Sequence, residues 1–159
     1  MTRSASSPPW RVGSTAARRR AALTRRPIDP SAFLREVADK DAGGTVLFVG
    51  TVRRRGEMGR VDTLEYQSYR EMAETRMKEI ETDVKKKWPI TKIRMLHREG
   101  KLRVGEVSVV VAVSSAHRAE AFEACRYAID RIKRSLPLWK RELERGRGKW
   151  VAGSPIARR

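Results

Sequence analysis

A chain of 159 residues with a hydrophobic content of 40% and a charged content of 35% is expected to fold as one globular domain. One cysteine and two histidines exclude an internal disulfide framework and a cysteine-based zinc cluster, and they make any metal site unexpected. The formal net charge of +17 predicts an anionic substrate, a nucleic acid or an acidic protein as partner, and no apolar run approaches the roughly 20 residues of a membrane helix.

The charge is concentrated at the amino terminus. Residues 1–28 contain seven arginines and no acidic residue, which leaves +10 for residues 29–159. This composition predicts a disordered basic tail, although a transit peptide or a mis-assigned start explains it equally well. The segment lacks the apolar core of a secretory signal, and the single cysteine is typical of a reducing compartment such as the cytoplasm.

The domain is expected to open with a helix and a strand. Ser31 is predicted to cap a short helix over residues 32–39, which ends before a glycine turn. Residues 45–52, TVLFVGTV, are predicted to form a buried strand, and Phe48 in its middle is most simply a core residue.

A basic loop and a long helix follow. Residues 53–60, RRRGEMGR, form a glycine-containing loop, and residues 61–67 alternate well enough to predict a second strand. Over residues 70–87 the apolar positions recur every three to five residues, which predicts an amphipathic helix that stops at Trp88 and Pro89.

The second half predicts more strands and another long helix. Residues 92–99 and the β-branched run VSVVVAV at 107–113 are expected to be strands. Ser114 or Ser115 is a natural N-cap for the helix that follows and ends at Pro137. Its apolar stripe is expected to contain Phe122, Cys125, Ala128, Ile129, Ile132 and Leu136.

The carboxyl-terminal part predicts one more helix and one more strand. Residues 138–146, LWKRELERG, are interpreted as a short helix, and residues 149–153 as an edge strand. Helices beside a mostly antiparallel or mixed sheet make an α+β domain the economical fold class.

His117 and Arg118 raise a question, because two potential cations would stand in a first helical turn that favours acidic residues. Helical geometry places Arg118 on the stripe of Phe122, which directs its guanidinium toward the packed side of the domain. Together with free backbone N–H groups, these side chains could bind a phosphate. Alternatively, Arg118 reaches solvent from the helix end and His117 only caps the helix.

Two lysines are further candidates. Lys133 lies at the border of the apolar stripe, and Lys140 follows just after the Pro137 break. A lysine that is partly desolvated among other cations has a lowered pKa and can serve as a general base or nucleophile. The alternative is an ordinary solvated lysine.

Arg53, with Arg54 and Arg55, could contact a phosphate from the end of a strand, or belong to a solvated loop or a nucleic-acid contact. Cys125 lies on the apolar stripe without a cationic neighbour on its own face, so it is expected to be a small buried hydrophobic residue without a catalytic role.

Several stretches, taken together, resemble the large catalytic subunit of molybdopterin synthase, the MoaE family. They are GGTVLFVGTVR (43–53), TLEYQSYREMAE (63–74), the long run from KKWPITKIRM to PLWKRE (86–142) and KWV (149–151). They follow the order of the family and cover nearly everything from about residue 30 to residue 152. The pattern SSAHRxxAFxAxxxxIDxxKxxxPxWKxE within them is long and specific.

The resemblance implies an α/β hammerhead-type core with additional antiparallel strands, encoded by residues 29–159. It also implies a sulfurtransferase that converts cyclic pyranopterin monophosphate to molybdopterin by installing two sulfur atoms. The sulfur arrives as a thiocarboxylate on the C-terminal glycine of a small ubiquitin-like subunit of MoaD type. Large subunits form a homodimer with one small subunit at each end, a heterotetramer, and no metal or bound coenzyme is needed.

The resemblance also assigns roles to individual residues. Lys133 matches the position regarded as catalytic, and Lys140 matches the position that supports it. His117 and Arg118 match positions that bind anionic groups of the substrate from the opposite protomer, assisted by Arg53. The positions that line the pterin pocket are matched by Phe48 and Ile129.

Two other hypotheses compete with this one. A basic nucleic-acid-binding module would explain the isoelectric point of about 11.1, yet the sequence contains no recognised RNA- or DNA-binding motif. An inactive paralogue used as a scaffold is disfavoured, because the five polar positions of the site are all retained.

Overall fold

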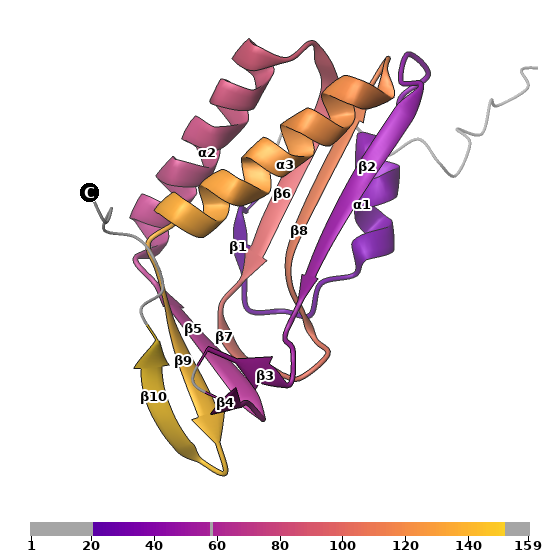
Figure 1. The fold of residues 1–159 in the computed structure, drawn as a ribbon. Helices are drawn as coiled ribbons and strands as arrows, with labels where there is room; N and C mark the ends of the chain where they lie inside the picture. Colours follow the sequence, from indigo (N-terminus) through magenta and orange to yellow (C-terminus); the bar gives the residue numbers. More distant parts are fainter. Residues whose placement is uncertain (1–20, 58, 152–159) are drawn as a thin grey trace, which may run out of the picture.

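Two four-stranded sheets carry the domain, and three helices cover the faces of the first sheet (Figure 1). The structure is a computed structural model, and it describes residues 21–57 and 59–151. Its elements in chain order are β1 (Leu23–Thr24), α1 (Pro30–Val37), β2 (Gly44–Thr51), β3 (Arg55–Gly56), β4 (Gly59–Arg60), β5 (Thr63–Ser68), α2 (Arg70–Lys87), β6 (Ile90–Arg98), β7 (Gly100–Arg103), β8 (Val107–Ser115), α3 (Arg118–Ser135), β9 (Leu138–Glu144) and β10 (Arg147–Val151). The predicted α+β class is confirmed.

The first sheet has the strand order β1-β6-β8-β2, and β8 is antiparallel to both of its neighbours. Alternate side chains of β8 enter different cores. Val109, Val111 and Val113 pack with α2 and α3, whereas Val110 and Ala112 pack with α1 on the opposite face. Because helices cover both faces, the middle of the strand from Val109 to Val113 is apolar on both sides, which explains the run VVVAV.

The second sheet has the order β10-β9-β5-β7 and is antiparallel throughout. It joins the first sheet at Gly100, whose φ of 88° lets the chain leave β6 and enter β7. The short hairpin of β3 and β4 lies beside this sheet, and a third apolar cluster includes Val52, Val61 and Leu64. The two sheets therefore meet close to the end of β2.

The domain starts earlier than the sequence analysis placed it. Leu23–Thr24 pair in parallel with His97 and Arg98 of β6, and Leu23 is fully buried. The boundary predicted after residue 28 is therefore too late, because burial of Leu23 and two strand pairings order this short segment. The rest of the predicted tail, residues 1–20, lies outside the described residues.

Both predicted serine caps are wrong. Asp29 caps α1, since its carboxylate accepts a hydrogen bond from the backbone N–H of Ser31 at 3.0 Å. Ser114 and Ser115 still belong to β8, where Gly44 of β2 pairs with Ser115, so the N-cap of α3 is His117. Strand pairing thus extends β8 beyond the point at which a serine could start the helix.

Residues 138–146 are a strand and a turn, which corrects the predicted helix. β9 pairs with β5 on one side and with β10 on the other. Glu, Lys, Arg and Leu favour helices locally, but pairing with two strands outweighs that preference. The predicted edge strand after it is confirmed as β10, whose described part ends at Val151.

Candidate active site

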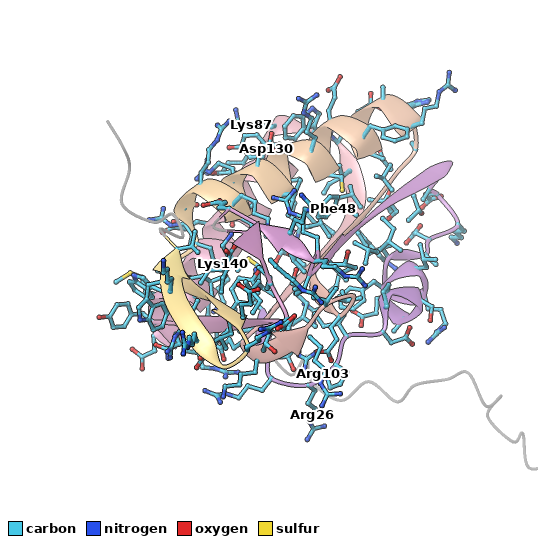
Figure 2. The ribbon with its side chains drawn as sticks, turned by 60° about the horizontal axis from the view of Figure 1, so that its bottom comes forward. Arg26, Phe48, Lys87, Arg103, Asp130 and Lys140 are labelled. Carbon is cyan, nitrogen blue, oxygen red and sulfur yellow. The ribbon has the colours of Figure 1, made fainter. Side chains whose placement is uncertain are left out.

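Three cationic side chains from different elements meet where the two sheets join. Lys133 lies in the last turn of α3, Lys140 on β9, and Arg53 two residues after the end of β2. The charges of Lys140 and Arg53 both act on Lys133. The structure therefore brings together three of the residues that the sequence analysis selected. Figure 2 turns this end of the molecule forward and labels Lys140.

The clustering changes the proton affinity of Lys133. Desolvation by the surrounding protein lowers the pKa of Lys133, and the positive charges of Lys140 and Arg53 lower the pKa further. Lys133 as a whole residue is nevertheless exposed, so a substrate can reach it. An accessible lysine with a lowered pKa is suited to general acid–base chemistry.

A buried polar layer lies beneath the cluster. His97 is 2% exposed, and its Nδ1–H donates to the carbonyl of Arg98 at 2.8 Å. Burial lowers the pKa of His97 to about 4, the hydrogen bond to Arg98 opposes this change, and the charge of Lys133 adds to it. The histidine is therefore neutral and adds no further positive charge below Lys133.

Tyr66 belongs to the same layer and connects the two sheets. Its ring meets the ring of His97 edge-on, with centroids 5.0 Å apart. Burial and the charge of Glu142 raise the pKa of Tyr66, whereas a hydrogen bond with Ser108 lowers it. Ser108 in turn donates to the carbonyl of Gly50 at 3.2 Å, which links β5 to β8 and β2.

The arginine-rich segment 53–60 folds over β9 as the hairpin of β3 and β4. The backbone N–H of Glu57 donates to Glu142 Oε1 at 3.1 Å, and the Glu57 carboxylate lies 3.7 Å from Lys140 Nζ. A Cβ on Gly56 would clash with the Glu142 carboxylate, so any other residue here requires the Glu142 side chain to shift. The hairpin thus forms one side of the cationic site.

Phe48 and Ile129 lie between β2 and α3. Ile129 is buried at 9% exposure, whereas Phe48 is 37% exposed, so the interpretation of Phe48 as a core residue is wrong. No residue of β2 is fully buried, because β2 is the edge strand of its sheet. A Cβ on Gly50 would lie 3.3 Å from the Phe48 ring, so the ring lies beside Gly50 along β2.

Cys125 faces the core beside these residues. Its side chain is buried, and its Sγ lies 3.8 Å from the carbonyl of Val111. Burial raises the pKa of the Cys125 thiol to about 11. The expected small buried residue is confirmed, and its thiol is protonated at neutral pH.

His117 and Arg118 lie at the other end of α3. Arg118 and Lys133 are 15 residues apart on one helix, which corresponds to roughly 22 Å. Both His117 and Arg118 are exposed, and Phe122 is 61% exposed, so the expectation that Arg118 points toward the packed side is wrong. Since β2 is the edge strand of its sheet, this flank of α3 has no further strand to pack against among the residues that the structure describes. Within one chain, a small ligand cannot contact both groups.

Three residues of the site did not emerge from the sequence analysis: Tyr66, His97 and Glu142. Glu142 follows Lys140 by two positions on a strand, so both side chains point to the same face. The incorrect helix prediction for this segment hid that relationship. His97 and Tyr66 carry no local signal, because their roles depend on contacts between separate strands.

The described residues contain no group of three or more His, Cys, Asp or Glu side chains that could hold a metal ion. None of the helices in this part of the chain is both long and apolar enough to cross a membrane.

Comparisons with known proteins agree with one another. The family model described as MoaE protein matches residues 23–135. The molybdopterin synthase catalytic subunit of Thermoplasma volcanium is 46% identical over 129 residues, which is 80% of this chain and 94% of the relative. The crystal structure of molybdopterin synthase from Staphylococcus aureus is similar with a TM-score of 0.78 and 34% identity, over 83% of this chain and 96% of that chain.

A third comparison concerns the fold alone. A complex of subunits 1 and 2 of the molybdopterin-converting factor from Helicobacter pylori contains a chain that is similar with a TM-score of 0.71. The two chains are 20% identical, and the match covers 85% of this chain and 92% of the other.

Proposed function

The chain belongs to the MoaE family, and from this membership we propose that it is the catalytic subunit of a molybdopterin synthase, a sulfurtransferase of molybdenum cofactor biosynthesis. Its substrate is cyclic pyranopterin monophosphate. The sulfur donor is a small ubiquitin-like subunit that carries a thiocarboxylate on its C-terminal glycine. Residues 29–159 form the catalytic domain, extended by the strand at Leu23–Thr24, and the enzyme works in the cytoplasm.

The observation that carries this proposal is the convergence of Lys133, Lys140 and Arg53 at the junction of the two sheets. The reaction brings two anions, a cyclic phosphate and a thiocarboxylate, into one place. Cationic side chains offset the repulsion between them and stabilise negative charge that develops during the reaction.

Lys133 is the catalytic residue in this proposal. The thiocarboxylate sulfur attacks a carbon of the pterin side chain and forms a C–S bond, the bond between that carbon and an oxygen breaks, and Lys133 donates a proton to the oxygen that leaves. Water then cleaves the bond between the sulfur and the acyl carbon, so that the sulfur stays on the pterin and the small subunit leaves with a carboxylate. A second small subunit supplies the second sulfur in the same way.

The remaining residues bind the reactants. Lys140 holds the carboxyl end of the small subunit and keeps the pKa of Lys133 low through its charge. Phe48 and Ile129 line the pterin pocket, and Arg53 contacts the anionic groups of the substrate. In this proposal the sulfur transfer needs no metal ion and no bound coenzyme.

His117 and Arg118 act from a second copy of the chain. The roughly 22 Å between Arg118 and Lys133 on one helix supports this assignment, because one substrate molecule cannot contact both ends. In this proposal two chains form a homodimer, and each binds one small subunit to give a heterotetramer. The pair of subunits named for the Helicobacter pylori complex supports the presence of a small partner.

The test mixes the purified chain with a thiocarboxylated small subunit and cyclic pyranopterin monophosphate, and measures molybdopterin as its fluorescent oxidation product. We expect product from the wild-type chain and none from Lys133→Ala. A folded dimer that binds the small subunit but yields no product would contradict the proposal.

A further inference from the structure

Glu57 is the one carboxylate in the arginine-rich segment 53–60, and the proposed function does not use it. Its carboxylate pairs with Lys140, the lysine that the proposed function assigns to the carboxyl end of the small subunit. The carboxylate of Glu57 thus pairs with the same lysine that the terminal carboxyl group of the small subunit has to reach.

The geometry of this ion pair makes it easy to exchange. Glu57 Oε1 lies 3.7 Å from Lys140 Nζ, which is longer than the 2.7–2.9 Å of a charge-assisted hydrogen bond. The Glu57 side chain is 60% exposed and that of Lys140 is 25% exposed. Exposed pairs of this kind contribute little, so a carboxyl group that reaches Lys140 directly can replace Glu57.

The backbone of Glu57 is held more firmly than its side chain. Its N–H donates to Glu142 Oε1 at 3.1 Å, and Glu142 is 6% exposed. The neighbouring Gly56 pairs with Gly59 in the hairpin of β3 and β4. Rotation of the Glu57 side chain can therefore release Lys140 while the hairpin stays in place.

We propose that Glu57 is a specificity-determining residue of the site, an internal carboxylate that occupies Lys140 and exchanges with the terminal carboxyl group of the small subunit. This inference rests on the proposed function, because it needs a carboxyl terminus as the incoming group. Glu57 keeps Lys140 paired when the partner is absent. After sulfur transfer it competes with the product carboxylate and promotes release of the spent small subunit.

The experiment compares the wild-type chain with Glu57→Gln, which removes the charge and keeps the backbone contact to Glu142. Glu79→Gln is the matched control, since it removes the same charge from α2, where Glu79 pairs with Arg76. The probes are a synthetic peptide that ends in a glycine carboxylate and the same peptide as its C-terminal amide. Calorimetry measures the affinity for each peptide, and mass spectrometry measures how fast an acetylating reagent modifies Lys140.

We expect Glu57→Gln to bind the carboxylate peptide two- to fivefold more tightly, up to about 1 kcal/mol, and to leave the affinity for the amide peptide unchanged. Acetylation of Lys140 should also become faster, because Glu57 no longer shields the ammonium. Glu79→Gln should behave like the wild-type chain in both assays.

Equal carboxylate affinities and equal acetylation rates in the wild-type chain and in Glu57→Gln would overturn the proposal. That result would leave the proposed function intact, whereas a second result would count against both proposals. If Glu57→Gln speeds acetylation but neither chain distinguishes the two peptides, then the site does not receive a carboxyl terminus. That outcome would contradict the proposed function and the exchange together, and would leave only an ion pair.

Discussion

The positive charge of Lys140 on β9 lowers the pKa of Lys133 at the end of α3, after desolvation has already lowered it. The two lysines lie on consecutive elements separated by Pro137, so a short connection places like charges near each other. Such an arrangement disfavours protonation of Lys133 and is typical of a functional site.

Replacement of Lys133 tests its catalytic role. Lys133→Ala should lower the rate of molybdopterin formation by at least about 100-fold, because a positioned proton-transfer group typically contributes that much. The far-ultraviolet circular dichroism spectrum and the unfolding midpoint should stay close to those of the wild-type chain, since Lys133 is exposed. Lys133→Arg retains the charge and cannot transfer a proton near neutral pH, so it should be similarly slow. Substantial activity in either variant would contradict the assignment.

The dependence of the rate on pH tests the coupling of the two lysines. Lys140→Met removes a positive charge, which makes protonation of Lys133 more favourable and raises its pKa toward the ordinary value of 10.5. The limb of the profile of kcat/KM against pH that reports Lys133 should therefore move to higher pH, whether Lys133 acts as acid or as base. Lys85→Met, which removes a lysine that pairs with Glu81 on α2, should leave the limb unchanged. An unmoved limb in Lys140→Met would show that the two charges are not coupled.

His97 should make the domain sensitive to acid. The ordinary pKa of histidine is 6.5, and burial lowers the pKa of His97 to about 4 in the folded chain, so the unfolded chain takes up the proton first as the pH falls. Stability is therefore lost from about pH 6.5 downward, and at pH 5 the loss due to this group amounts to about 2 kcal/mol.

Urea unfolding at pH 7.5 and pH 5 measures this effect. The decrease in the free energy of unfolding between the two pH values should be smaller in His97→Gln than in the wild-type chain. His117→Gln is the control, because His117 is exposed. If His97→Gln and the wild-type chain lose the same free energy, the histidine is not the acid-sensitive group.

Cys125 should be dispensable for turnover. Sulfur arrives with the small subunit in the proposed reaction, and burial raises the pKa of the Cys125 thiol to about 11. Cys125→Ala should retain nearly full activity, and in the native wild-type chain the thiol should react with a disulfide reagent at pH 8 only after denaturation. A collapse of the rate in a folded Cys125→Ala chain would mean that this thiol carries sulfur.

Mixing two inactive variants tests whether His117 and Arg118 act across a dimer. Lys133→Ala and Arg118→Ala should each be nearly inactive alone. After unfolding and refolding together, mixed dimers contain one intact site, so about a quarter of the wild-type activity should return if pairing is random. A mixture that stays inactive would show that these residues do not complement each other between chains.

Local patterns in the sequence determined several elements correctly. The helix predicted over residues 70–87 has the bounds of α2, because Pro89 cannot continue a helix and the apolar spacing is regular. The run at 107–113 lies within β8, and Lys133 lies at the border of the apolar stripe, as predicted. In each case the prediction depends only on residues that are close together in the sequence.

Contacts between distant segments decided the rest. Residues 138–146 have helix-favouring side chains but form β9, since β5 and β10 provide strand partners that no local pattern reveals. Ser114 and Ser115 remain in β8 for the same reason.

The sequence by itself therefore determined the α+β class, the long helices, the basic character and the residues that resemble the MoaE family. The tertiary structure alone decided that Lys133, Lys140 and Arg53 meet, that Glu57 pairs with Lys140, and that Arg118 lies far from Lys133. Local spacing fixes which side chains share one face of an element. Which faces come together depends on packing and on strand pairing between residues that are far apart in the chain.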